Sequence, residues 1–159
     1  MGLEQTQEKR ELALLDQINN DPDITQANLA GKLDVAVGTV NWHLKRLIAK
    51  GYVKAKRAQR KKLRYIITPE GLALRARLTV NYIENQMRLY SQTRQQVKNL
   101  LGEIKKLGYG EVRIRGDSEI ADVCRLTCLE QGIEIVSEGK IPILEIQGYT
   151  VILNLDQAL

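Results

Sequence analysis

Residues 35–69, VAVGTVNWHLKRLIAKGYVKAKRAQRKKLRYIITP, contain no acidic residue. The first part of this stretch repeats apolar residues at helical spacing and places four of them on one stripe: Val40, Leu44, Leu47 and Ile48. Polar, basic and aromatic side chains fall on or near the opposite face: Thr39, Asn41, Trp42, Lys45 and Arg46. The spacing predicts a helix over residues 37–50 that buries one side and leaves the other free for a partner.

The segment then changes to a strand, a basic loop and a second strand. Gly51 ends the helix, Tyr52 and Val53 open the first strand, and residues 65–68 form the return strand. Seven basic residues lie around the loop: Lys54, Lys56, Arg57, Arg60, Lys61, Lys62 and Arg64. Because so many like charges repel one another, the phosphates of DNA are the simplest partner. The alternative is a solvated basic hairpin without a ligand.

Two further helices are predicted upstream. Residues 24–33, ITQANLAGKL, have Thr25 as N-cap and place Leu29, Ala30 and Leu33 on one face. Residues 4–19 form the first helix, with three residues turned inward: Leu12, Leu15 and Ile18. Residues 34–36 are short enough to turn the chain sharply between the second and third helices. Together these elements predict a winged helix-turn-helix domain over residues 1–71.

In that geometry the helix of residues 37–50 enters the major groove of double-stranded DNA. Thr39, Asn41 and Lys45 are the candidates for reading bases, and the wing contacts phosphates. The second helix lies over the backbone, where its N-terminus and Gln26 meet a phosphate. The complete set of predicted DNA contacts is Thr25, Gln26, Gly38, Thr39, Asn41, Trp42, Lys45, Arg46, Lys56, Arg57, Arg60, Lys61, Lys62 and Arg64.

Residues 8–100 resemble the MarR-type winged-helix regulators, in particular the group associated with exopolysaccharide loci. The resemblance rests on Gly38-x-Val40-Asn41 with Trp42, on LKRLIAKG at residues 44–51 and on TPEG at residues 68–71. It implies a DNA-binding regulator of transcription. Two positions depart from that group: Ala36 stands where a small polar residue caps the recognition helix, and Asn28 stands where a capping-box glutamate is common.

A heptad pattern follows the winged helix and predicts a long coiled-coil helix over residues 72–108. After Ala73 and Ala76, the core positions alternate steps of 3 and 4 residues: Val80, Ile83, Met87, Tyr90, Arg94, Val97, Leu101 and Ile104. Covering such a seam within the chain would require another long helix, and the sequence offers none. Pairing with a second copy, as a homodimer, is therefore predicted. The alternative is that the helix packs back on its own winged helix, as residues 72–78 do in either case.

Residues 109–159 predict a small α/β domain that resembles half of a Rossmann fold. A strand over 111–115, a helix over 119–131 and a strand over 132–136 form a βαβ unit, and residues 141–146 and 149–155 form a hairpin. The turn GDSEIA makes Gly116, Asp117 and Ser118 a candidate ligand site. Ser118 replaces the second glycine of a dinucleotide-binding turn, and Asp117 and Glu119 repel phosphate. No cofactor is predicted; a structural or dimerising role is favoured, with small-ligand sensing as the alternative.

Charge divides the chain in the same way. Residues 1–108 carry 20 Lys and Arg against 10 Asp and Glu, whereas residues 109–159 carry 4 against 9.

Cys124 and Cys128 are four residues apart on one face of the predicted helix, which predicts that both lie in the core. A zinc site is not predicted, because zinc needs four ligands and His43 lies in another domain. His43 itself is predicted to be a partly buried helix residue.

The sequence thus predicts an α+β protein with a winged helix-turn-helix, a long coiled-coil linker helix and a small βαβ C-terminal domain. The predicted function is that of a homodimeric, sequence-specific transcriptional regulator; whether it has a small-molecule effector is left open. The alternatives are a nucleoid-type or partition protein that coats DNA, and a regulator governed by ligand binding to the tail. No enzyme, metal site or membrane partner is predicted, and the absence of a signal-peptide pattern or long apolar run predicts a cytoplasmic protein.

Overall fold

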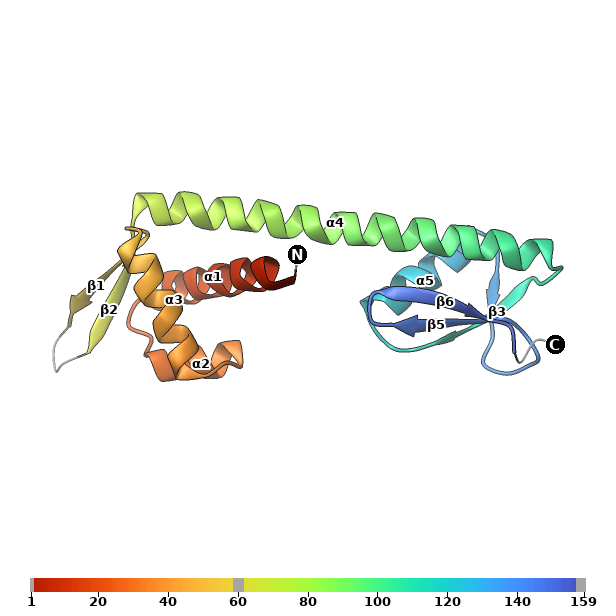
Figure 1. The fold of residues 1–159 in the computed structure, drawn as a ribbon, viewed down its shortest axis with the longest axis horizontal. Helices are drawn as coiled ribbons and strands as arrows, with labels where there is room; N and C mark the ends of the chain where they lie inside the picture. Colours follow the sequence, from red (N-terminus) through yellow and green to blue (C-terminus); the bar gives the residue numbers. More distant parts are fainter. Residues whose placement is uncertain (1, 59–61, 157–159) are drawn as a thin grey trace. The chain divides into compact units, whose positions relative to one another are not determined.

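The computed structural model describes residues 2–58 and 62–156, and the chain divides into two compact units, Met1–Glu84 and Asn85–Leu159. The predicted α+β class is confirmed: a winged helix is followed by a long helix and a small C-terminal sheet (Figure 1). The expected division into 1–71, 72–108 and 109–159 differs from this one. The long helix is not a separate unit, because its two halves pack into different cores.

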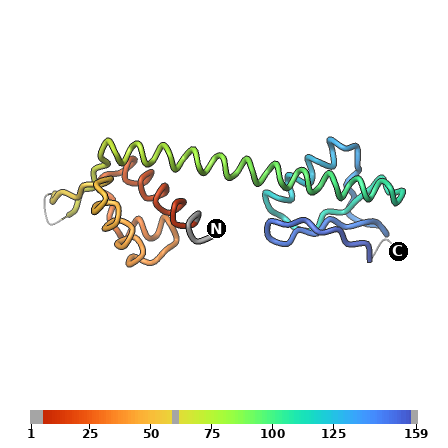
Figure 2. The backbone as a smooth tube through the Cα atoms, turned by 45° about the horizontal axis from the view of Figure 1, so that its top comes forward, coloured from red at the N-terminus to blue at the C-terminus, as the bar shows by residue number. Residues whose placement is uncertain are grey.

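Three helices form the core of the first unit: α1 (Gly2–Asn20), α2 (Gln26–Leu33) and α3 (Val37–Ala49), whose winding can be followed in Figure 2. Their apolar faces meet in one cluster that includes Leu15, Ile18, Leu29, Val40, Leu44 and Leu47. The predicted stripe of α3 is confirmed except at Ile48, which is 37% exposed. Eight residues at 100° each carry Ile48 about 80° around the helix from Val40, away from the core.

Local chemistry fixes both ends of α2. The Thr25 hydroxyl accepts a hydrogen bond from the Asn28 backbone N–H at 3.1 Å, which confirms the predicted N-cap. At the other end Asp34 adopts the left-handed conformation, with φ of 52°, and lets the chain turn into α3. By contrast, the α3 N-cap, Ala36, provides no side-chain hydrogen bond.

The wing is an antiparallel pair of strands, β1 (Val53–Arg57) and β2 (Leu63–Ile67). Gly51 ends α3 with φ of +77°, a conformation that favours glycine. β2 begins two residues before the predicted return strand of residues 65–68. The basic residues Lys62 and Arg64 on either side of Leu63 make this start look like part of the loop. Tyr65 is the buried residue of β2 and anchors the wing in the core.

The wing returns to the helices through a junction made by Thr68. Its hydroxyl lies 2.7 Å from the Gly51 carbonyl oxygen and 3.2 Å from that of Tyr52, and it accepts a bond from the Gly71 N–H at 3.0 Å. Gly71 is pressed against the Tyr52 carbonyl: a Cβ there would overlap that oxygen and lie 2.8 Å from Ile67 Cγ2. The start of α4 (Pro69–Lys106) is therefore held against Gly51 and Tyr52, the two residues that precede β1.

The second unit contains a four-stranded sheet in the order β4-β3-β5-β6. Its strands are β3 (Glu111–Arg115), β4 (Glu134–Ile135), β5 (Ile143–Gln147) and β6 (Thr150–Asn154), and α5 (Glu119–Glu130) connects β3 to β4. β3 runs parallel to β4 and β5, and β5 pairs antiparallel with β6. The predicted βαβ unit and terminal hairpin are both confirmed.

The last part of α4 belongs to the core of this second unit. Val97, Leu101 and Ile104 are at most 1% exposed and lie in one cluster with Val112, Cys124, Cys128 and Leu144. The prediction that these three residues face a second copy is wrong. α5 and the sheet cover them, so no second long helix is needed at this point of the seam.

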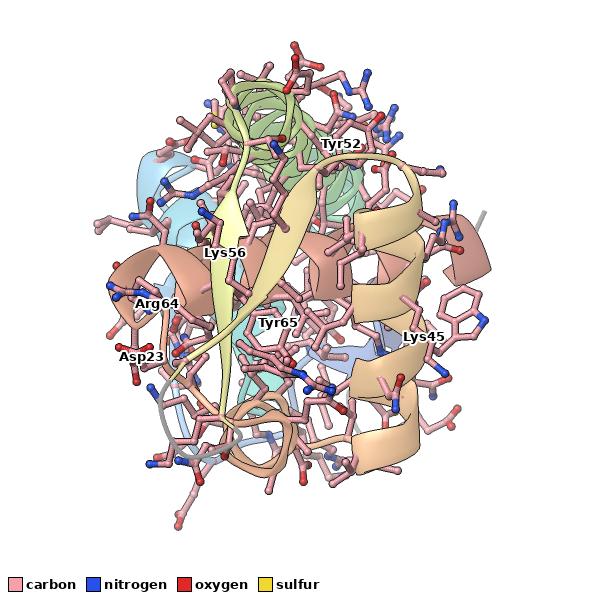
Figure 3. The ribbon with its side chains drawn as sticks, turned by 90° about the vertical axis from the view of Figure 1, so that its left-hand side faces the viewer. Asp23, Lys45, Tyr52, Lys56, Arg64 and Tyr65 are labelled. Atoms are coloured by element: carbon pink, nitrogen blue, oxygen red, sulfur yellow. The ribbon has the colours of Figure 1, made fainter. Side chains whose placement is uncertain are left out.

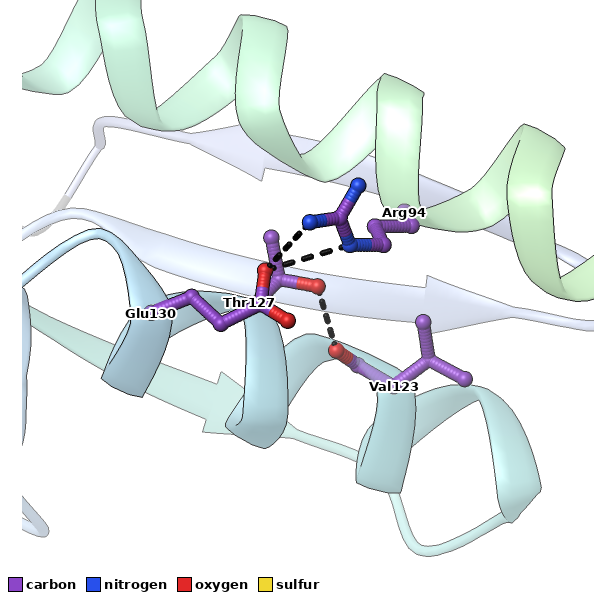
Figure 4. A network of polar contacts seen from close by, with 4 residues as sticks. All are labelled: Arg94, Val123, Thr127 and Glu130. Atoms are coloured by element: carbon purple, nitrogen blue, oxygen red, sulfur yellow. Dashed lines mark hydrogen bonds and ion pairs between the residues drawn. The ribbon is translucent and has the colours of Figure 1, made fainter.

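Arg94 of α4 forms an ion pair within its own chain. Its Nε and Nη2 donate to Glu130 Oε2 of α5 at 3.1 and 2.8 Å, as Figure 4 shows. In the same close-up the Thr127 hydroxyl donates to the Val123 carbonyl at 2.7 Å, within α5. Arg94 is one of the core positions predicted from the heptad pattern, and this ion pair gives it a partner on α5 of its own chain.

The two cysteines are core residues, as predicted. Cys124 and Cys128 are fully buried, and burial raises the pKa of each thiol to about 11. Both therefore remain protonated at neutral pH, which makes them poor nucleophiles and poor metal ligands.

We predict that Gly71→Ala lowers the free energy of unfolding of the first unit by at least about 2 kcal/mol, because the new methyl group must displace the Tyr52 backbone. The matched control is Gly102→Ala, also in α4, where an added Cβ meets nothing within 4 Å. That change should stabilise the helix by ~0.5–1 kcal/mol. Urea unfolding followed by circular dichroism measures both, and equal effects of the two substitutions would contradict the assignment.

Candidate nucleic-acid interface

The outer face of α3 presents the side chains predicted to read DNA. Lys45 is exposed and projects away from the helix, as Figure 3 shows, while Thr39 and Asn41 are half-buried. Gly38 is exposed, and a Cβ built on it would meet no atom within 4 Å. Packing inside the protein therefore does not require a glycine in this turn, where alanine would favour the helix. A partner that approaches the backbone closely would explain it.

Trp42 and Arg46 form a stacked pair on one edge of this face. Trp42 is 54% exposed, and the Arg46 guanidinium carbon lies 5.5 Å from the centre of its ring. Arg46 Nε is also 3.7 Å from Glu11 Oε1 of α1. The arginine is thus oriented by two contacts within the domain, and Lys45 is the less constrained cation on the helix.

His43 lies beneath Trp42 and is 3% exposed, so the prediction of a buried helix residue is confirmed and the burial is more complete than expected. Burial lowers the pKa of His43; Arg10 and Arg46 act in the same direction, and Glu11 opposes them. The imidazole is therefore neutral at pH 7 and adds no charge to the interface.

The N-terminus of α2 and the wing border one hollow of about 310 Å³, lined in part by Thr25, Gln26, Lys62 and Tyr65. Gln26 Nε2 donates to the Tyr65 hydroxyl at 3.1 Å and so joins α2 to β2. Part of the Gln26 amide is therefore occupied, whereas the backbone N–H groups in the first turn of a helix have no carbonyl partner in that helix. The Asn28 N–H is already bonded to the Thr25 hydroxyl, so the remaining N–H groups of this turn, together with Lys62, can receive a phosphate.

Basic side chains gather on one face of the wing. Lys56 pairs directly with Arg64 across the two strands, and Lys54 pairs with Ile66, so all three cations lie on the same side. Arg64 Nε is 3.7 Å from Asp23 on the side of the wing away from α3 (Figure 3). Lys56 and Arg57 are exposed, and like charges this close favour an anionic partner. Arg60 and Lys61 lie outside the described residues.

Two further positions were missed by the sequence analysis. Tyr65 holds the α2–wing hollow together, and its signal was the single aromatic residue in the alternating return strand. Arg10 of α1 lines a second hollow, of about 460 Å³, with Gly38, Thr39 and Trp42. Arg10 had no local motif to reveal it, because only the packing of α1 against α3 brings it to the reading face.

The turn of the second unit is explained by the chain itself. Ser118 caps α5 by accepting a hydrogen bond from the Ala121 N–H at 3.4 Å. Gly116 has φ of +127° and packs against Ile146, whose Cβ would be 3.0 Å from an added side chain.

The described residues contain no cluster of three or more His, Cys, Asp or Glu that could hold a metal ion. Of the helices in the same part of the chain, none has the length and apolar character that crossing a membrane requires.

Residues 7–54 match the protein-family model described as winged helix-turn-helix DNA-binding. Among solved structures the chain is similar to a MarR protein from Peptoclostridium difficile, with 22% identity, a TM-score of 0.45, and coverage of 60% of this chain and 67% of that one. It is also similar to MepR, a transcription regulator of the Staphylococcus aureus multidrug efflux pump MepA, with 22% identity, a TM-score of 0.45, and coverage of 62% and 78%. A search of curated proteins finds no match. The first unit therefore contains a winged helix-turn-helix, most of which lies in the segment that matches a model described as DNA-binding.

We predict that Gly38→Ala separates DNA affinity from stability. The substitution should leave the domain as stable as before or slightly more so, because the methyl group meets open space. Its affinity for duplex DNA should fall at least about fivefold, or ~1 kcal/mol, because the methyl group enters the interface. Fluorescence anisotropy of labelled DNA measures the affinity, with Gly102→Ala as control. Unchanged DNA binding by the Gly38 variant would remove this turn from the interface.

Proposed function

We propose that the protein is a sequence-specific regulator of transcription that binds double-stranded DNA. The observation that carries the proposal is the grouping, in one small unit, of the open face of α3, the N-terminus of α2 and a basic wing. Each is suited to contact a different part of the duplex. α3 would contact base edges in the major groove, α2 a phosphate, and the wing further phosphates.

Reading of sequence is assigned to Thr39, Asn41 and Lys45. A hydroxyl, an amide and an ammonium group near the start of α3 can hydrogen-bond to base edges, and an amide can bond in a bidentate way to adenine. The wing contributes affinity without sequence information, because phosphates are the same at every step. The resemblance to exopolysaccharide-associated regulators makes genes of such a locus the first candidates for control.

A protein that coats DNA, of nucleoid or partition type, is the competing function. It would need the phosphate contacts but not the polar side chains at the start of α3. Footprinting on the DNA upstream of the protein's own gene distinguishes the two functions. A regulator protects one short palindrome, whereas a coating protein protects long tracts uniformly.

Two variants test the same division of roles. Asn41→Ala should cost ~1–3 kcal/mol on the protected site and much less on random DNA. Lys62→Ala should weaken binding to both DNAs alike and reduce the slope of log affinity against log salt by about 1. Equal loss on both DNAs for Asn41→Ala would refute base reading by this residue.

We further propose that the protein acts as a homodimer through the middle of α4. Val80, Ile83 and Met87 are 52%, 54% and 61% exposed, and Tyr90 follows at 38%. These residues keep the heptad steps of 3 and 4 that a paired helix requires, and the part of the chain that the structure describes leaves them exposed. Two reading heads would then engage two half-sites about one helical turn apart.

The dimer prediction uses the double variant Ile83→Asp with Met87→Asp, which adds two carboxylates to the proposed seam. Burying them unpaired should cost several kcal/mol, so sedimentation should show a monomer and affinity for the protected palindrome should fall sharply. Gln92→Asp, at an exposed α4 position off the heptad seam, is the control and should remain a dimer. A double variant that still sediments as a dimer would place the dimer contact elsewhere.

A further inference from the structure

The second unit contains a hollow of about 360 Å³ that the DNA-binding function does not use. Its walls come from three segments of this unit: α4, the first turns of α5 and the β5–β6 turn. The lining residues are Gln86, Leu89, Tyr90, Ser118, Glu119, Ile120, Val123, Gly148 and Tyr149. The volume falls within the range of roughly 300–1,000 Å³ that is usual for small-molecule sites.

Most of this lining is apolar or aromatic. Leu89, Ile120 and Val123 supply aliphatic walls, and Tyr90 and Tyr149 add two phenol rings. Tyr149 is 75% exposed although it is a large aromatic residue, so the fold itself does not bury it. An apolar ligand body would remove this surface from water, at roughly 25 cal/mol per Å².

The charge of the lining has one sign. Glu119 is the only ionisable acid or base among the lining residues apart from the two tyrosines, and no lysine or arginine lines the hollow. The N-terminus of α5 carries roughly half a positive charge, and the full negative charge of Glu119 in the same turn exceeds it. The Ser118 hydroxyl is engaged in capping the helix. An anionic ligand would therefore meet repulsion, whereas a cation would meet a carboxylate and aromatic rings.

We propose that this hollow binds a small amphipathic cation: an apolar, ring-sized body that carries one ammonium group. The body packs on Leu89, Ile120 and Val123, and the cationic group lies by Glu119, where a tyrosine face stabilises it further. The site lies within the second unit, so it can be tested without DNA, and it shares one residue, Tyr90, with the proposed dimer seam.

Benzyltrimethylammonium is the probe, with its neutral carbon analogue neopentylbenzene and the anion phenylacetate for comparison. Each is titrated into the full chain labelled at isoleucine, leucine and valine methyl groups, and binding is followed by NMR. The cation should shift the methyl signals of Leu89, Ile120 and Val123 in a saturable way. It should bind at least threefold more tightly than the neutral analogue and at least tenfold more tightly than phenylacetate.

Glu119→Gln should weaken binding of the cation at least threefold and leave that of the neutral analogue unchanged. Glu134→Gln, an exposed acid outside the hollow, is the matched control and should behave like the unmodified chain. Tyr149→Ala should also weaken binding of the cation, because the substitution removes one of the two aromatic rings that line the hollow. The proposal is overturned if none of the three probes saturates these signals, if phenylacetate binds as well as the cation, or if Glu119→Gln has no effect.

Discussion

The hydrogen bonds of Thr68 fix the geometry on which the winged helix-turn-helix unit depends. One hydroxyl joins Gly51 and Tyr52, the two residues that precede β1, to the first turn of α4, and Gly71 lets that turn lie directly on the Tyr52 carbonyl. Tyr65 makes a second connection, from the wing to α2 through Gln26. The wing therefore has a defined position relative to α3, so that major-groove and phosphate contacts can form at the same time.

The sequence was sufficient to predict those parts of the structure that local capping and spacing determine. The Thr25 cap, the turn after α2, the bounds of α3 and the βαβ unit all follow from spacing and capping within a few residues. The heptad pattern of α4 was not sufficient, because a run of apolar residues at steps of 3 and 4 does not identify what covers it. Val97, Leu101 and Ile104 are covered by α5 and the sheet, whereas Val80, Ile83 and Met87 remain exposed. Only long-range packing separates the two groups, and the same packing brings Arg10 to α3.

The surroundings of three glycines explain why a glycine stands at each position, which the sequence alone does not reveal. Gly71 and Gly116 are required by the chain, since an added side chain would meet Tyr52 in one case and Ile146 in the other. Gly38 has no such neighbour, and close approach of the proposed DNA partner would account for a glycine there. Charge supports the same division, because the excess of basic residues lies in residues 1–108 and the excess of acidic residues lies in 109–159. The proposed DNA interface and the proposed cation site thus fall in parts of the chain with opposite net charge.

The single tryptophan offers the most direct measurement of the central claim, that the outer face of α3 enters DNA. Trp42 is 54% exposed in the free protein, and its fluorescence is therefore open to quenching by acrylamide. Quenching is measured before and after saturation with the DNA of the footprint, with saturation confirmed by anisotropy. The account predicts that bound DNA lowers the quenching constant at least about twofold. Saturated binding with unchanged quenching would show that α3 stays outside the duplex and would contradict the account.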